Sequence, residues 1–136
     1  MCKIKFINNH LNKDSRGILN SVEAFQQTGI KYLRYFIIRD IKGGIRGGHA
    51  HKETNQIMQI IQGSILLKFQ YFNEKGSYKL NPDSKPIFLP KLTWVEMSEI
   101  TKDAIILVLS SDEYNIKKSI RDIDNYNSYI KDFILN

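Results

Sequence analysis

The feature that most constrains this chain is a pair of histidines separated by one residue, directly after a glycine-rich segment. The stretch reads Arg46-Gly47-Gly48-His49-Ala50-His51, and Gly43 and Gly44 lie just before it. Side chains alternate between the two faces of a strand, so His49 and His51 are predicted to project from the same face. Glycines allow a tight turn or a close approach of a ligand to the backbone. The pattern therefore predicts a loop leading into a strand that presents two imidazoles to one pocket.

Short apolar segments recur along most of the chain and predict an all-β fold. Besides the histidine strand and a strand ending at the Gln62-Gly63-Ser64 turn, strands are expected at residues 3–7, 18–22, 32–40, 65–72, 78–80, 87–89, 94–97 and 104–109, with a hairpin turn at 73–76. Strands this short and closely spaced favour a barrel or sandwich over βαβ units. From Asn115 onward, isoleucines and tyrosines recur every three or four residues, which predicts an amphipathic C-terminal helix, broken once near residues 124–125.

The spacing around the histidines resembles the first motif of the cupin β-barrels. The matching positions are Gly43, His49, His51, Gln56 and Gly63. The resemblance implies a cupin-type barrel, or jelly roll, in which a glutamate and a third histidine usually complete a metal site. Those two places hold Gln56 and Val95, and neither an amide nor an aliphatic side chain is a good ligand for a transition metal. Two histidines fall short of the usual three protein ligands, so we predict no metal and no other cofactor.

Length, cysteine content and net charge limit which kind of protein this is and which partners suit it. We expect a single domain over residues 1–136, and the single cysteine, Cys2, fits a reducing compartment. Neither a membrane span nor a signal-peptide pattern is recognisable, so the protein is expected to be cytoplasmic, without a membrane partner. The net charge of +6 favours an anionic partner. Because the basic residues are scattered, a small molecule bearing a diphosphate fits better than a nucleic acid.

A closer resemblance is carried by Arg46-Gly47-Gly48-His49-Ala50-His51-Lys52, which is similar to the Arg-Gly-aromatic-His-Ala-His-Lys signature of the nucleoside-diphosphate-sugar 3,4-ketoisomerases, the WxcM-like group of cupins. Further agreement is found at residues 14–17, at Trp94 with Glu96-Met97, and at residues 107–114 and 120–126. The resemblance implies an isomerase that moves the carbonyl of a dTDP-linked 4-keto-6-deoxyhexose from C4 to C3. It further implies a role in making a 3-amino-3,6-dideoxy sugar for a surface glycan.

The same resemblance implies a set of site residues. His49, His51 and Tyr35 are expected to be catalytic, and Arg16, Arg46, Trp94 and Arg121 to bind substrate. An enediol mechanism needs only acid–base groups, for which imidazoles suit neutral pH, and His51 is the expected base. Aligning on Arg34 instead of His49 would put Phe36 in the place of Tyr35. Gly48 replaces the usual aromatic and opens space beside His49. In the family, the residues at the places of Arg16 and Val95 help to set the C4 configuration of the product; Arg16 favours the galacto type, but Val95 replaces the usual histidine or arginine, so that configuration stays open.

Two other functions remain open on the sequence. A 3,5-epimerase also removes protons beside a 4-keto group, although it acts at two carbons, and a non-catalytic cupin could bind a nucleotide sugar without turnover. The family resemblance and the isoleucine stripe from Ile116 to Ile134 both predict a homodimer.

Overall fold

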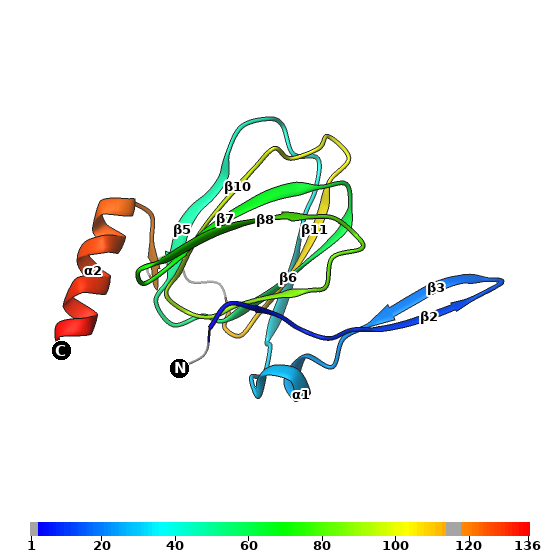
Figure 1. The fold of residues 1–136 in the computed structure, drawn as a ribbon, viewed down its shortest axis with the longest axis horizontal. Helices are drawn as coiled ribbons and strands as arrows, with labels where there is room; N and C mark the ends of the chain where they lie inside the picture. The colour runs from blue at the N-terminus through cyan, green and yellow to red at the C-terminus, as the bar shows by residue number, and fades with distance from the viewer. Residues whose placement is uncertain (1–2, 114–117) are drawn as a thin grey trace.

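Two five-stranded β-sheets face each other in the computed structural model, which describes residues 3–113 and 118–136 (Figure 1). The elements are β1 (Lys5–Phe6), β2 (His10–Asp14), β3 (Gly17–Ser21), α1 (Ala24–Thr28), β4 (Arg34–Ile38), β5 (Arg46–His51), β6 (Gln56–Gln62), β7 (Ile65–Tyr71), β8 (Glu74–Leu80), β9 (Ile87–Leu89), β10 (Thr93–Ser98), β11 (Ile105–Ser110), β12 (Ser119–Ile120) and α2 (Ile123–Leu135). The predicted all-β barrel with a C-terminal helix is confirmed.

The two sheets have the strand orders β1-β9-β6-β11-β4 and β12-β5-β10-β7-β8, and the strand pairs within them are antiparallel. Their inner faces enclose the main core, which comprises Met58, Ile60, Ile65, Leu67, Leu80, Ile87, Leu89, Val95, Met97, Ala104, Ile106 and Val108. Every second residue of β11 is buried, as expected for a strand with one face toward a core. The barrel therefore follows from alternation that is visible in the sequence.

A two-stranded hairpin of β2 and β3 projects from the barrel on the side away from α2 (Figure 1). All ten of its strand residues are exposed, including the apolar Leu11, Ile18 and Leu19. The strand predicted at residues 18–22 corresponds to β3, whereas β2 lies where no strand was predicted. Among the described residues the strands of the hairpin pair only with each other, and the exposure of their apolar side chains indicates that the barrel does not cover them.

The turn between β7 and β8 lies upstream of its predicted position. Tyr71 pairs with Glu74, so Phe72 and Asn73 form the turn, and Phe72 has a φ of 56°. Gly76, which we took as a turn residue, lies within β8 opposite Phe69. A Cβ on Gly76 would lie 2.7 Å from the Phe69 ring. This glycine therefore makes room for an aromatic ring and does not form the turn.

The C-terminal helix is shorter than predicted. Ile120 belongs to β12, which pairs with β5, and α2 starts after Asp122, whose carboxylate accepts hydrogen bonds from the backbone N–H groups of Asp124 and Asn125. What resembled a break in one long helix is thus the cap at the start of a shorter one. Tyr126 and Ile130 bury this helix against the outer face of β5 and β10.

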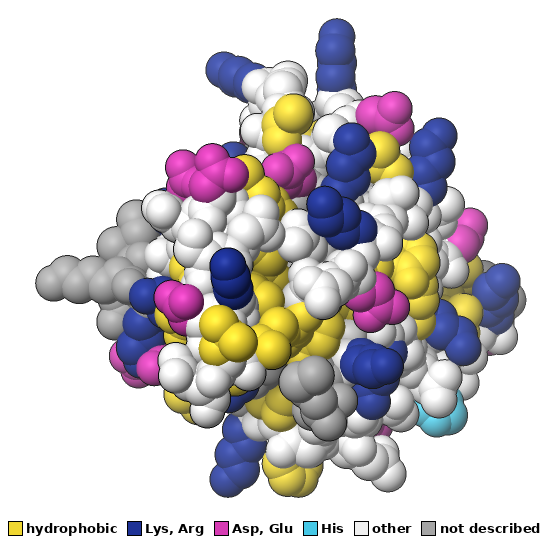
Figure 2. Space-filling view, turned by 60° about the vertical axis from the view of Figure 1, so that its left-hand side comes forward, with side chains coloured by type: hydrophobic (Ala, Val, Ile, Leu, Met, Phe, Trp, Pro, Cys, Tyr) yellow, Lys and Arg dark blue, Asp and Glu magenta, His cyan; other side chains and the backbone are white. Residues whose placement is uncertain are grey.

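Cys2, Asn115, Ile116 and the last residue of the 107–114 segment, which the sequence analysis used, lie outside the described residues. Among the helices described, none has the length and apolarity needed to cross a membrane. Lys and Arg side chains are spread over the face seen in Figure 2 and are mixed with Asp and Glu.

Candidate active site

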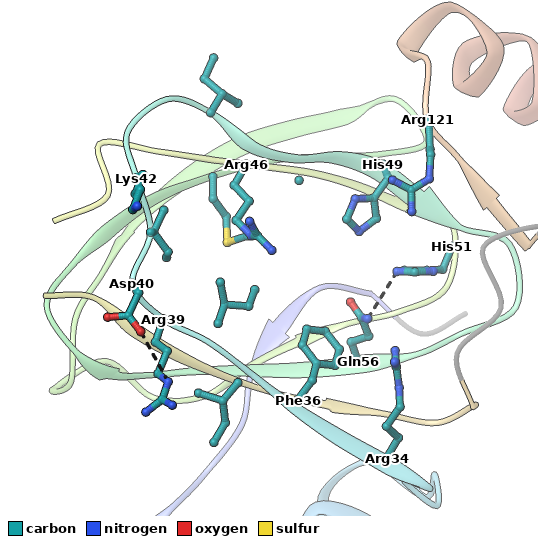
Figure 3. Close-up of a pocket in the computed structure, with 16 residues that line it drawn as sticks. Arg34, Phe36, Arg39, Asp40, Lys42, Arg46, His49, His51, Gln56 and Arg121 are labelled. Atoms are coloured by element: carbon teal, nitrogen blue, oxygen red, sulfur yellow. Dashed lines mark hydrogen bonds and ion pairs between the residues drawn. The ribbon is translucent and has the colours of Figure 1, made fainter. Parts of the chain in front are cut away.

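A pocket of about 940 Å³ opens between β4, β5 and the loop that joins them (Figure 3). Its lining comprises Arg34, Phe36, Ile37, Ile38, Arg39, Asp40, Ile41, Lys42, Ile45, Arg46, Gly47, His49, His51, Gln56, Met97 and Arg121. The predicted residues that come together in it are His49, His51, Arg46 and Arg121. They come from one strand and from the segment that follows β12, which β12 brings alongside β5.

Alternation along β5 turns both histidines into the pocket. Ala50, between them, pairs with Trp94 and is fully buried on the outer face of the sheet, beneath α2. His49 and His51 consequently point inward, as predicted. Two residues of strand rise correspond to about 7 Å along the backbone, but the ring centroids lie only 5.0 Å apart, with the rings at 76°. Both imidazoles can therefore reach one small molecule at the same time.

Gly47 shapes the approach to the histidines. It has a φ of 90°, and a Cβ there would lie 2.9 Å from the Val95 carbonyl oxygen. The register between β5 and β10 shifts at this point, between Val95 and Glu96. A residue with a side chain would therefore push the two strands apart beside the pocket. The neighbouring Gly48 also has a positive φ, 69°, but a Cβ there would meet open space.

The environment keeps His51 uncharged at neutral pH. The pKa of His51 is lowered to about 4. Burial is the largest cause, and the charges of His49, Arg121 and Arg34 act in the same direction. The Asp112 carboxylate acts in the opposite direction. At pH 7 the imidazole is consequently free to accept a proton.

His49 is tuned in the same direction. Burial lowers its pKa, a hydrogen bond with the Gly47 backbone opposes this effect, and the charges of Arg121 and Arg46 add to the lowering. Because both rings are neutral at pH 7, each offers one N–H donor and one acceptor nitrogen. The pair can take a proton from one atom and deliver another nearby.

Gln56, at the start of β6, faces His51. Its amide nitrogen lies 3.4 Å from Nε2 of His51, and the residue is only 7% exposed (Figure 3). Val95, at the place where we looked for a third histidine, lies in the apolar core. Within residues 3–113 and 118–136, no three His, Cys, Asp or Glu side chains gather in a way that could hold a metal.

Most of the charged side chains in the remaining lining are cationic. Arg46 and Arg121 were predicted, whereas Arg34, Arg39 and Lys42 were missed. The guanidinium of Arg34 lies over the Phe36 ring, 4.9 Å from its centroid, and extends toward His51 (Figure 3). The one acid in the lining, Asp40, pairs with Arg39 at 3.6 Å. Arg34 could have been found from the sequence, because it lies two residues before Phe36 and side chains two apart in a strand share a face.

The structure corrects the predictions for Tyr35 and Trp94. Tyr35 is 67% exposed on the outer face of β4, and Phe36 lines the pocket, because alternation puts neighbouring residues on opposite faces. Trp94 pairs with Ala50 and therefore shares its outward orientation. It packs against Tyr126 of α2 at a ring distance of 5.8 Å, on the opposite face of the sheet from the histidines. Neither side chain belongs to this pocket.

Arg16 is likewise remote from the pocket of its own chain. It lies in the turn of the β2–β3 hairpin, with a side chain that is 89% exposed and paired with Asp14 at 2.7 Å. That ion pair holds the pKa of Asp14 below its usual value. Within one chain, then, only four of the seven predicted site residues come together.

The fold and the site define a cupin-type barrel whose pocket combines two neutral imidazoles with a cationic rim. The chain belongs to the FdtA family, described as WxcM-like, C-terminal, whose model matches residues 2–131. It is similar to the TDP-4-oxo-6-deoxy-alpha-D-glucose-3,4-oxoisomerase of Aneurinibacillus thermoaerophilus, with 32% identity over 118 residues, which cover 86% of this chain and 85% of that protein.

Solved structures of similar proteins agree with this family. A 3,4-ketoisomerase from Helicobacter canadensis is 31% identical, with a TM-score of 0.88 over 96% of this chain and 99% of that one. The sugar 3,4-ketoisomerase QdtA from Thermoanaerobacterium thermosaccharolyticum, in complex with TDP, is 26% identical, with a TM-score of 0.88 over 96% of each chain. A 4-keto-6-deoxy sugar epimerase, NovW from Streptomyces spheroides, is only 14% identical with a TM-score of 0.74 over 85% of this chain and 67% of that one, which is a likeness of fold alone.

Proposed function

We propose that the protein isomerises a TDP-linked 4-keto-6-deoxyhexose, moving the carbonyl from C4 to C3. The observation that carries this proposal is the pair of neutral imidazoles, 5.0 Å apart, inside a pocket lined by four arginines. The TDP-4-oxo-6-deoxy-alpha-D-glucose-3,4-oxoisomerase of Aneurinibacillus thermoaerophilus supports the substrate class. The TDP bound to QdtA supports the nucleotide.

The reaction needs only proton movements. His51 removes the hydrogen on C3 as a proton, and the electron pair of that bond forms a C3–C4 double bond. At the same time His49 donates its N–H proton to the C4 oxygen, which produces an enediol. His49 then accepts the proton of the C3 hydroxyl as the new carbonyl forms, and His51 returns its proton to C4. Atoms and electrons balance without an oxidant or a metal, and neutral imidazoles suit both tasks.

The cationic rim would hold the nucleotide. Arginine guanidinium groups bind phosphate oxygens through paired hydrogen bonds, and Arg46 and Arg121 flank the histidines in the lining. Binding energy from the diphosphate can then place the sugar ring over the imidazoles. The apolar surface of Phe36 offers a contact for the 6-deoxy part of the sugar or for the base.

The two alternatives differ in where solvent hydrogen enters the sugar. We would incubate the protein with TDP-4-keto-6-deoxyglucose in heavy water and follow the sugar by NMR. Isomerisation would produce a 3-keto sugar, with deuterium at C4 wherever the transferred proton exchanges with solvent. A 3,5-epimerase would retain the C4 carbonyl and label C3 and C5, and a binding protein would label nothing above the background rate. Retention of the C4 carbonyl would overturn the proposal. The closeness of the two imidazoles favours chemistry at one edge of the ring.

We also propose that the protein works without a metal, because Gln56 and Val95 stand where cupins place further ligands. A 3-keto product is the substrate that an aminotransferase needs to make a 3-amino-3,6-dideoxy sugar. We propose that amination consumes the product.

A homodimer is proposed as well, but with a different interface from the one that the isoleucine stripe suggested. The buried face of α2 packs on its own sheet, whereas the β2–β3 hairpin exposes Ile18 and Leu19. The edge strand β4 exposes Tyr35 and Ile37 on its outer face. A second copy could cover these surfaces, and it is the route by which Arg16, at the hairpin turn, could serve a pocket.

A further inference from the structure

The amide of Gln56 contacts one ring nitrogen of His51, the residue that acts as the base in the proposed reaction. Gln56 is held firmly, because β6 is hydrogen-bonded on both sides: Gln56 pairs with Leu89 of β9 and with Ser110 of β11. Its side chain is buried and points into the pocket, where its amide nitrogen lies 3.4 Å from Nε2 of His51. The contact joins the two sheets across the pocket.

A neutral amide can hydrogen-bond to either protonation state of an imidazole. Its NH₂ group donates to a lone pair, and its carbonyl oxygen accepts from an N–H. An amide nitrogen can only donate, so a hydrogen bond in this arrangement requires the tautomer of His51 with the lone pair on Nε2 and the proton on Nδ1. A carboxylate could only accept, and it would favour a charged ring with a proton on Nε2.

We propose that Gln56 is a positioning residue that holds the His51 ring uncharged, with its lone pair on Nε2. Because Nε2 has a single lone pair, the amide has to move aside when the C3 hydrogen of the sugar approaches that nitrogen. The amide thus sets the tautomer of the ring before the reaction, without adding a charge that would favour the protonated state. The part of this inference that concerns proton transfer rests on the proposed function, whereas the effect on the ring does not.

The charges around His51 explain why a neutral side chain is needed at residue 56. Arg34 and Arg121 approach the ring from two other segments, and His49 lies beside it on β5. Asp112, after β11, is the carboxylate that opposes them, and it accepts a hydrogen bond from Thr54 at 3.1 Å. A second carboxylate, in direct contact with the ring, would tip this balance toward the imidazolium and remove the base.

The first test introduces that carboxylate. Gln56→Glu keeps the size of the side chain, and an opposite charge in contact shifts a pKa by about 1–3 units. The pKa of His51 is measured by NMR on protein with isotope-labelled histidine, without any sugar present. We expect a rise of at least about one unit over wild type. Gln59→Glu is the matched control, since Gln59 lies on the same strand but on its other face, and it should leave the pKa of His51 unchanged. Equal His51 pKa values in all three proteins would overturn the proposal.

The second test removes the hydrogen bond without adding charge. In Gln56→Leu the lone pair of His51 should no longer be confined to Nε2, so the ¹⁵N chemical shifts of the ring should move toward a mixture of tautomers. This measurement decides the question even if Gln56→Glu does not fold. Wild-type shifts that place the proton on Nε2, or shifts unchanged in the leucine variant, would contradict the inference.

Kinetics links the ring to turnover. In Gln56→Leu, loss of the hydrogen bond that orients His51 is expected to lower kcat by about tenfold, with KM little changed. In Gln56→Glu the acid limb of kcat/KM should move to higher pH together with the pKa of His51. If the NMR shifts appear but no isomerase activity exists in wild type, the proposed function fails and the role of Gln56 in setting the state of His51 stands.

Discussion

Replacing His51 by Asn tests the assignment of the base most directly. Asparagine retains part of the volume and a hydrogen-bonding group, but it has no site that accepts a proton at neutral pH. Because the pKa of His51 is about 4, nearly every wild-type molecule at pH 7 has this base ready, with only about one ring in a thousand protonated. The variant therefore loses a fully active base. General-base catalysis contributes about 10²–10⁴ in rate, so we expect kcat to fall by at least about 10²-fold, or about 2.7 kcal/mol in activation free energy.

Nucleotide affinity is the internal control for this variant. Arg46 and Arg121 line the pocket independently of His51, so binding of TDP, measured by calorimetry, should change little. His49→Asn should be similarly or slightly less damaging. The double variant should not multiply the two losses, because the rings act as one proton-transfer unit. Exchange of the C3 hydrogen with heavy water at a near-wild-type rate in His51→Asn would refute the assignment of the base.

Four further outcomes are expected. Because the folded pKa of His51 is about 4 against 6.5 unfolded, its burial should make the protein less stable as pH falls from 6.5 to 4, and acid thermal melts should reveal a loss that His51→Asn reduces. Activity should survive chelation, and elemental analysis showing a metal at one per chain whose removal abolishes turnover would contradict this. Gly47→Ala should cost about 1–3 kcal/mol in the free energy of unfolding, more than Gly48→Ala, which meets no atoms; equal losses in urea titrations would argue against the contact with Val95. Sedimentation should reveal a dimer that Leu19→Asp weakens, and a 15.9 kDa wild-type species at micromolar concentration would rule the dimer out.

Local sequence determined the parts of the site that follow from strand periodicity. His49 and His51 share a face because they are two residues apart in a strand, and this was predictable without knowing what lay opposite. The barrel followed in the same way, from short alternating segments bounded by turn residues. Periodicity also indicates that only one of Tyr35 and Phe36 can face the pocket. Which of them does so depends on the register of β4 against β11, because a shift of one residue exchanges the two faces of a strand.

Only the tertiary structure decided what each face meets. Trp94 is a residue type that often lines ligand pockets, yet its pairing with Ala50 puts it beneath α2. Gly76 is a residue type that is common in turns, yet it lies within a strand against the ring of Phe69. The contact between Gln56 and His51 also needed the fold, because it depends on how two sheets are spaced across a cavity. Alternation along a strand is set by local backbone geometry, whereas the partner across a core is set by packing between segments that are distant in sequence.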